Sequence, residues 1–367
     1  MIKKKIGIIF GGKSAEHEVS LQSAKNIVDA IDKEKYDVAL IGIDKEGKWH
    51  ISDQTSYLLN EENPKLIQLN KTNQGIAVIP GENQRQLKSA AQSSDLDQID
   101  VVFPIVHGTL GEDGSMQGML RLANLPFVGA NVLGSAVCMD KDIAKRLLRE
   151  SGISVAKSMT FTRKSIGKMD FNKVKSNLGL PLFIKPANQG SSVGVSKVEN
   201  EEDFHQGIKD AFQFDHKIII EESIIGREIE CAVLGNEEPI ASLPGEIKPK
   251  KGFYSYESKY IDETGAELAI PAELSSELTE KVKQTAVEVF QSLECEGLAR
   301  VDFFLKEDGE LVVNEVNTLP GFTKISMYPK LWEISGVPYH ELINRLIELA
   351  VERHKRDMQL KNVMWDE

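Results

Sequence analysis

The sequence contains little cysteine and little proline. Its three cysteines, Cys138, Cys231 and Cys295, lie far apart without a CxxC or Cys/His spacing, so they indicate neither a disulfide framework nor a zinc site. They favour buried thiols in a reducing cytoplasm. Only 13 of 367 residues are proline and 41% are hydrophobic, which argues against disorder and against a fibrous repeat. We expect a globular protein of two or three domains.

The sequence also lacks long apolar runs and a basic character. The apolar run 6–10 is too short for a signal peptide, and Pro126, Gly129 and Gly134 interrupt the uncharged run 122–139. Acidic residues outnumber basic ones 56 to 44, giving a net charge of -12. Such a surface repels phosphate backbones. We therefore expect no membrane span, no nucleic-acid partner and a cytoplasmic location.

Short apolar runs alternate with helical patterns in the first part of the chain, which is typical of a parallel α/β unit. Strands are predicted at 5–10, 37–44 and 100–107, with helices near 20–31 and 115–123. The polar stretch at about 47–97 is predicted to be an insertion with short hairpin-like pieces.

A second pattern begins near residue 140. It predicts a helix to 151, strands at 158–161, 182–185, 193–198, 218–221, 229–234 and 240–247, a helix near 275–293, a hairpin and a closing helix near 339–351. We expect an α/β (α+β) chain of three domains, at 1–130, 131–226 and 227–367, of which the central one is small.

Residues 7–14, Gly-Ile-Ile-Phe-Gly-Gly-Lys-Ser, match the Walker A pattern letter for letter. In a P-loop the first glycine follows a strand, whereas Gly7 lies inside the only apolar run available. We therefore reject a P-loop NTPase and expect Lys13 to be dispensable for nucleotide binding.

Polar residues follow two predicted strands at the edge where α/β proteins bind ligands. Glu16 follows Gly11-Gly12 and could hold a cationic amine, although an acid at a helix N-terminus explains it equally well. His107 ends the strand at 101–106 and precedes a glycine-rich loop. A structural role is the alternative for a lone histidine.

A lysine and a glycine-rich loop together predict a phosphate site. Lys185 ends a buried strand and is followed by the loop 188–194, Asn-Gln-Gly-Ser-Ser-Val-Gly. Gly190 and Gly194 let the backbone approach an anion, and the serines add hydroxyl donors. With Lys141, this arrangement favours phosphate binding over a plain turn.

The segment 300–317 is the most informative part of the chain. Asp308-Gly309 is a hairpin turn signal, and symmetric pairing about it gives partner numbers that add to 617. Asp302 then faces Glu315, and Arg300 faces Asn317. All four lie on one face, and the apolar face holds Val301, Phe303, Val312 and Val316.

Two opposed carboxylates repel each other unless a cation lies between them. The oxygen atoms of Asp302, Glu315 and the Asn317 amide suit magnesium, and Arg300 beside them can hold an anionic substrate. A solvent face of mixed charges is the alternative interpretation.

In these motifs the chain resembles the D-alanine--D-alanine ligase family of the ATP-grasp superfamily along nearly its whole length. The resemblance is carried in order by residues 11–20, 107–114, 139–141, 185–194, 256–260 and 314–323. It implies an ATP-grasp fold behind an N-terminal Rossmann-like (pre-ATP-grasp) domain. The phosphate loop then belongs to the central subdomain, and the metal hairpin and a lid at about 248–264 belong to the C-terminal one. A homodimer is also implied.

The resemblance implies the residues that bind ATP and metal. Some members have a lysine at the position of Glu222, where its side chain can contact adenine. With Glu222 in its place, contacts from the backbone to adenine are expected there. The implied ATP ligands are Lys141 and Lys185 at the phosphates, Glu221 and Glu228 at the adenine and ribose end, and in addition Ser191, Ser192 and Lys259. Asp302, Glu315 and Asn317 would bind two magnesium ions, with manganese as an alternative ion.

The resemblance also implies an amino-acid pocket. Glu16 would hold the ammonium of the first D-alanine, and its reacting carboxylate would lie among His107, Arg300 and the Gly321 N–H. Lys259 and Ser326 would bind the carboxylate of the second D-alanine, and Tyr260 with Ser191 and Glu16 would close the loop over the site.

The implied reaction is ATP-dependent synthesis of D-alanyl-D-alanine for peptidoglycan, through a D-alanyl phosphate. Arg300 and the Gly321 N–H would stabilise the tetrahedral oxyanion, and no residue identifies itself as the base for the second amine. Tyr260 argues against the alternative of a D-alanine--D-lactate ligase. The presence of Arg300, Asp302, Glu315 and Asn317 argues against a non-catalytic nucleotide sensor.

Overall fold

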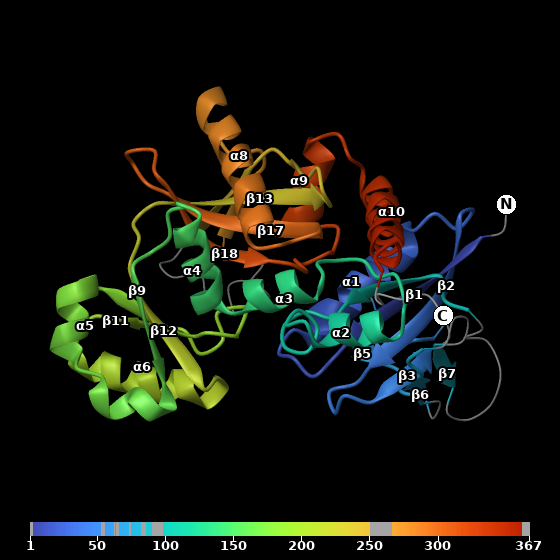
Figure 1. Ribbon diagram of the computed structural model, residues 1–367, viewed down its shortest axis with the longest axis horizontal. Coiled ribbons are helices and arrows are strands. Elements are labelled where there is room, and N and C mark those ends of the chain that lie inside the picture. The colour runs from blue at the N-terminus through green and yellow to red at the C-terminus, as the bar shows by residue number, and fades with distance from the viewer. Residues whose placement is uncertain are drawn as a thin grey trace.

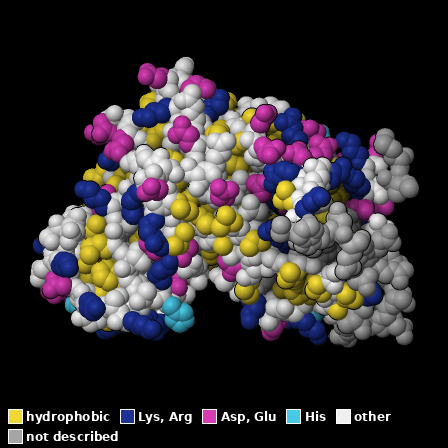
Figure 2. Space-filling model, viewed as in Figure 1, with side chains coloured by type: hydrophobic (Ala, Val, Ile, Leu, Met, Phe, Trp, Pro, Cys, Tyr) yellow, Lys and Arg dark blue, Asp and Glu magenta, His cyan; other side chains and the backbone are white. Residues whose placement is uncertain are grey.

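The computed structural model describes residues 3–52, 56–61, 63, 66–72, 75–81, 86–89, 98–249 and 266–361. The described chain forms three larger β-sheets with helices packed around them (Figure 1). A notch in the lower outline separates the lobe of α5 and α6 from the lobe of β6 and β7 (Figure 2). None of the described helices is long and apolar enough to cross a membrane.

The first sheet has the order β3-β2-β1-β8. β1 (Lys4–Gly11), β2 (Tyr36–Ile43) and β8 (Val101–Ile105) are parallel, as predicted, and β3 (Trp49–Ser52) adds an antiparallel edge. Gly7 lies inside β1 and Phe10 is fully buried, so the Walker-like residues form a strand and not a P-loop.

Two helices and two small hairpins complete this lobe. α1 (His17–Ala30) begins three residues before the predicted start, directly after Glu16, and α2 is Ser115–Leu122. Short strands pair in the polar stretch at about 47–97: β4 (Leu58–Leu59) with β5 (Gln68–Leu69), and β6 (Ile76–Val78) with β7 (Leu87–Ser89).

The second sheet is antiparallel with the order β11-β10-β12-β9. The predicted strand at 193–198 is shorter than expected, because Gly194 has a positive φ of 68° and keeps the first residues in the phosphate loop. The sequence patterns missed α5 and α6. The elements of this lobe are α4 (Lys141–Glu150), β9 (Ser158–Thr162), the 3-10 helix η1 (Arg163–Lys168), α5 (Phe171–Leu178), β10 (Leu182–Pro186), β11 (Ser196–Val198), α6 (Glu201–Phe214) and β12 (Lys217–Glu222).

The third sheet has the order β16-β15-β13-β17-β18, with β14 paired to β13. The single strand expected at 240–247 is two strands, because Pro244 lies between them and cannot donate a ladder hydrogen bond. Its elements are β13 (Arg227–Gly235), β14 (Ile240–Ala241), β15 (Gly245–Pro249), β16 (Ala266–Ala269), α8 (Ser276–Ser292), β17 (Gly297–Leu305), β18 (Leu311–Asn317), α9 (Met327–Ile334) and α10 (Tyr339–Met358). Acidic side chains gather on the upper edge, over α8 (Figure 2).

The N-terminal lobe and the C-terminal helices share one hydrophobic core. Phe103 of β8 packs against Phe322, and Leu342 and Ile343 of α10 belong to the same buried cluster. The buried Arg353 of α10 donates to the carbonyls of Phe127 and Gly129. α10 therefore joins the third sheet to the first, between which it lies in Figure 1.

Helix α3 (Val132–Met139) packs closely against the turn before β17. A Cβ at Gly134 would lie 2.5 Å from the carbonyl oxygen of Glu294. One turn further along α3, the Sγ atoms of Cys138 and Cys295 are 3.4 Å apart. All three cysteines are buried and free, as expected, but no pattern in the sequence predicts that two of them meet.

We predict that Gly134→Ala lowers the free energy of unfolding by about 1–3 kcal/mol, because the methyl group has no room against the Glu294 carbonyl. Gly118 in α2 is the matched control, since nothing lies within 4 Å of a Cβ placed there. Gly118→Ala should be neutral or stabilising by up to about 1 kcal/mol. Denaturant unfolding of both variants measures this, and equal effects would contradict the close approach of α3.

Candidate active site

A β-bulge brings the predicted metal ligands onto one face of the β17–β18 hairpin. Asp302 pairs with Glu315 and Arg300 with Asn317, as predicted. Near the turn, however, Leu305 pairs with Leu311 and Phe303 with Val313, one residue out of the predicted register. The register shifts between Asp302 and Phe303, which leaves Asn314 as the extra residue.

The bulge corrects one prediction about the two faces. Val312 was expected on the apolar face, but it pairs with Phe304 and therefore lies on the face of Asp302 and Glu315. Val313 takes its place in the core with Val301 and Phe303. The symmetric register failed because it had no extra residue in β18.

Protein groups compensate the charges of the two opposed carboxylates. Arg300 binds both oxygens of Asp302 at 2.7 Å, and its Nε lies 3.0 Å from Glu230 Oε2. Asn317 Nδ2 donates to Asp302 Oδ2 at 2.9 Å, and Lys141 Nζ lies 3.4 Å from Glu315 Oε2. Glu230 belongs to no motif and was not predicted from the sequence.

The donors on this face fit a hard divalent cation. Asp302, Glu315 and Asn317 offer only oxygen atoms from neighbouring positions of one hairpin, which are the ligands that magnesium prefers. No cluster of three or more His, Cys, Asp or Glu side chains that could hold a metal occurs among the described residues. A magnesium ion here would therefore depend on the amide oxygen of Asn317 as well as on the two carboxylates.

Lysines face this hairpin from the second sheet and from α4. Lys185 of β10 and Lys145 of α4 bind opposite oxygens of Glu221, at 2.8 and 3.0 Å. Burial raises the pKa of Glu221, but the charges of the two lysines outweigh burial and lower it to about 2. Both lysines also reach the bulge residue, Lys145 at the carbonyl of Asn314 and Lys185 at its amide oxygen.

Lys145 is a site residue that the sequence analysis missed. It is 3% exposed and follows Lys141 by one helical turn, on the same face of α4 as the buried Ala144 and Leu148. A charged residue on the apolar face of a helix is the signal that could have found it.

The phosphate loop between β10 and β11 contacts the N-terminal lobe. Ser191 and Ser192 have positive φ values of 51° and 59°, a conformation in which successive N–H groups can form a concave anion site. Ser191 Oγ donates to Glu16 Oε1 at 2.5 Å, and Lys141 Nζ donates to the carbonyl of Gln189 at 2.7 Å. The structure thus brings Glu16, Ser191 and Lys141 together around one loop.

Next to Glu16 lie two titratable residues, the buried His107 and the half-buried Glu112. Burial lowers the pKa of His107, and its Nδ1 lies 2.9 Å from the carbonyl oxygen of Leu319. Glu112 accepts from Gly108 N at 2.7 Å. Burial and the nearby charge of Glu16 raise the pKa of Glu112 to about 8. No role was predicted for Glu112, although it belongs to the glycine-rich loop after His107.

The remaining predicted residues lie at the edge of this group. A Cβ at Gly321 would be 3.0 Å from Ser326 Oγ, and that hydroxyl is 2.8 Å from Thr323 Oγ1. Glu228 is close enough to Lys185 to contribute to raising its pKa. Lys259 and Tyr260, and most of the expected lid, lie outside the described residues.

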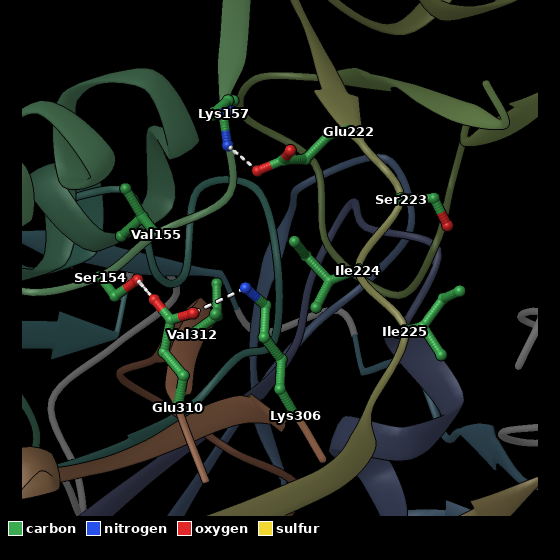
Figure 3. Close-up of a pocket in the computed structure, with 10 residues that line it drawn as sticks. All are labelled: Ser154, Val155, Lys157, Glu222, Ser223, Ile224, Ile225, Lys306, Glu310 and Val312. Carbon is green, nitrogen blue, oxygen red and sulfur yellow. Dashed lines mark hydrogen bonds and ion pairs between the residues drawn. The ribbon is translucent and has the colours of Figure 1, made fainter. Parts of the chain in front are cut away.

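A cavity of about 440 Å³ lies between the second and third sheets, where the segments 154–157 and 222–225 meet (Figure 3). Its apolar lining includes Val155, Ile224 and Val312. The side chain of Glu222 accepts from Lys157 N at 2.7 Å, so it fixes the crossing segments to each other (Figure 3). Val312 lines the cavity and lies on the same face of the hairpin as Asp302.

Two family models match the chain: the D-ala D-ala ligase N-terminus over residues 5–130 and the D-ala D-ala ligase C-terminus over residues 147–348. The D-alanine--D-alanine ligase of Oceanobacillus iheyensis is 67% identical over 361 residues, which are 98% of this chain and 99% of that protein.

The chain is also similar to solved structures of ligases. The D-alanine-D-alanine ligase from Coxiella burnetii has a TM-score of 0.83 at 39% identity and covers 97% of this chain and 96% of its own. The VanG D-Ala:D-Ser ligase from Enterococcus faecalis has a TM-score of 0.84 at 38% identity over 95% and 100% of the two chains. The D-alanine--D-alanine ligase from Bacillus anthracis, complexed with ATP, has a TM-score of 0.72 at 27% identity over 96% and 99%.

The predicted α/β (α+β) fold, an ATP-grasp fold behind a Rossmann-like N-terminal domain, is thereby confirmed. By its matched family models and by its identity over nearly the whole chain, this protein belongs to the D-alanine--D-alanine ligase family.

Proposed function

We propose that this chain joins two D-alanines at the expense of ATP at the meeting point of its three sheets. The observation that carries the site assignment is the face of Asp302, Glu315 and Asn317, which lies opposite the lysines of α4 and β10. Opposed acids and lysines around a loop with an anion-binding backbone suit a metal-bound triphosphate. Residues 1–130, 131–226 and 227–367 would be its three domains.

Each charged group would hold one part of ATP. Lys141 and Lys185, with Ser191, Ser192 and Lys259, would contact the phosphates, and Asp302, Glu315 and Asn317 would hold two magnesium ions or manganese. Bound magnesium would neutralise charge on the phosphoryl group that is transferred. The adenine end would lie towards the cavity at Ile224, with Glu221 and Glu228 near adenine and ribose, since Val312 links that cavity to the hairpin face.

The amino-acid pocket would lie among Glu16, Arg300 and Gly321. The Glu16 carboxylate would bind the ammonium of the first D-alanine, and Arg300 would bind its carboxylate, which attacks the γ-phosphoryl group to give D-alanyl phosphate and ADP. Lys259 and Ser326 would bind the carboxylate of the second D-alanine.

Attack by the second amine would form a tetrahedral intermediate that collapses to D-alanyl-D-alanine and phosphate. Arg300 and the Gly321 N–H would stabilise its oxyanion. The contact of Ser191 with Glu16, joined by Tyr260, would close the loop and keep water from the acyl phosphate. We also propose a homodimer in the cytoplasm, which family membership favours, and use of the dipeptide in peptidoglycan synthesis.

We predict stoichiometric phosphate and D-alanyl-D-alanine from ATP, magnesium and D-alanine. A parallel reaction with D-alanine and D-lactate should give mainly the dipeptide, because the lid sequence keeps Tyr260. Phosphate release and mass spectrometry of the products measure both. D-alanyl-D-lactate as the main product would contradict the assigned second substrate, and phosphate release independent of D-alanine would contradict the ligase assignment.

We predict that Lys185→Met raises the KM for ATP by about 10-fold or more, because a charged contact to phosphate is lost. Lys13→Met is the matched control for the Walker-like motif. Lys13 is exposed and follows the strand β1, so its replacement should leave the KM for ATP within about twofold. Steady-state kinetics at saturating D-alanine distinguish the two, and the reverse order would restore the P-loop interpretation.

A further inference from the structure

Gly321 belongs to a loop that is otherwise buried. Leu319 is 4% exposed and Phe322 is fully buried, whereas Gly321 between them is half-buried. Phe322 packs against Phe103 of β8, and its carbonyl accepts from Tyr339 Oη at 2.6 Å. The peptide that would offer its N–H to the reacting carboxylate is therefore held in place by the residues on both sides of it.

Two residues of the N-terminal domain connect those neighbours. His107 Nδ1 lies 2.9 Å from the carbonyl oxygen of Leu319, and His107 Nε2 lies 3.2 Å from Ser23 Oγ. Ser23 Oγ in turn accepts from the backbone N–H of Phe322 at 3.4 Å. Leu319, His107, Ser23 and Phe322 thus form a closed chain of hydrogen bonds that brackets Gly321.

The direction of each hydrogen bond follows from the chemistry of the atoms. The Leu319 carbonyl can only accept, so His107 Nδ1 carries a proton. In a neutral ring Nε2 is then an acceptor, so the Ser23 hydroxyl donates its proton to Nε2 and keeps a lone pair for the Phe322 N–H. Every donor and acceptor of this chain is used once, with the histidine in one tautomer.

This arrangement leaves His107 no ring nitrogen for a substrate. The side chain is 2% exposed and both nitrogens already have protein partners. We propose that Ser23 is a positioning residue for the ligase reaction, which acts through His107 to fix the Leu319–Phe322 loop and so aims the Gly321 N–H at the reacting carboxylate. This inference rests on the proposed function, and it gives His107 a positioning role in place of the direct substrate contact that the family resemblance implies.

Ser20 offers a control for a purely structural role of Ser23. It lies three residues earlier on α1, is equally buried at 0% exposure and also makes two hydrogen bonds. Its hydroxyl donates to the carbonyl of Ile105 and accepts from Gly11 N, which are both in the first sheet. Ser20 therefore matches Ser23 in burial and in its number of hydrogen bonds, but among the described residues its hydroxyl bonds only to the first sheet and not to the 319–322 loop.

The test compares Ser23→Ala with Ser20→Ala in the full-length enzyme. Both variants should lose thermal stability, because each removes a buried hydroxyl with two partners. Only Ser23→Ala should lower kcat, by about 10-fold to 100-fold, with the KM for ATP within about twofold, because the loss falls on a transition-state donor. An equal kcat for the two variants would overturn the proposal.

A double-mutant cycle tests whether Ser23 acts through His107. The double variant Ser23→Ala, His107→Gln should be no slower than His107→Gln alone, because the second change removes a link that is already broken. Multiplicative losses in kcat would overturn the proposed path. If the wild-type enzyme makes no dipeptide, the proposed function fails, and these kinetic comparisons then have no reaction to report on.

A measurement on the wild-type protein keeps the inference falsifiable where Ser23→Ala does not fold. Nitrogen NMR of ¹⁵N-histidine-labelled protein, with His107→Gln to assign the signal, should show the tautomer with the proton on Nδ1. A proton on Nε2 would overturn the hydrogen-bond chain, whatever the activity of the enzyme.

Discussion

The β-bulge in β18 is the local constraint on which the proposed metal face depends. A regular hairpin continuing from the turn would place Asn314 opposite Asp302 and send the side chain of Glu315 to the apolar face. Val313 is in the core in either register, but the extra residue Asn314 reverses the alternation beyond it, so that Glu315 and Asn317 join Asp302. The same residue turns its carbonyl and amide towards Lys145 and Lys185. A single irregularity thus places both the acidic face and the contacts of the facing lysines.

The charged residues around this face compensate one another's charge. Glu221 is 3% exposed, and a carboxylate so buried is tolerated because Lys145 and Lys185 each bind one of its oxygens. Arg300 has acids on two sides, Glu230 and Asp302. The Glu221 pairs link α4 to the second sheet, and the Arg300 pairs lie within the third sheet. The ion pair of Lys141 with Glu315 joins α4 to the third sheet, so the cations keep their orientation without a ligand. A phosphate or carboxylate that enters would compete with these acidic side chains for the lysines and Arg300. This competition favours an anion that binds together with a metal ion.

The sequence predicted the parts of this site that depend on local patterns. Alternating runs located β1, β2 and β8, and a turn signal located the β17–β18 hairpin. The predicted pairing of Asp302 with Glu315 is confirmed, but the reason given for it was wrong. The prediction used one register for the whole hairpin, whereas the real register differs by one residue near the turn and reaches the predicted one only after the bulge between Phe303 and Asp302. Lys145, Ser23 and the meeting of Cys138 with Cys295 depend on how distant segments pack, and no local pattern encodes that packing.

The N-terminal domain does more than present Glu16 to a substrate. Glu16 reaches the phosphate loop of the second sheet at Ser191, and His107 reaches the 319–322 loop that follows the third sheet. Each of these contacts crosses from the first sheet to a segment that would touch a reacting group. Because α10 and Arg353 fix the first sheet to the third, the contact at Leu319 joins parts that already share a core. The contact at Ser191 has no such support from a shared core cluster among the described residues, since the apolar residues of the second sheet pack in a cluster of their own. In the proposed function, the phosphate loop would move, and it would close against the Gly321 loop, which the shared core holds in place.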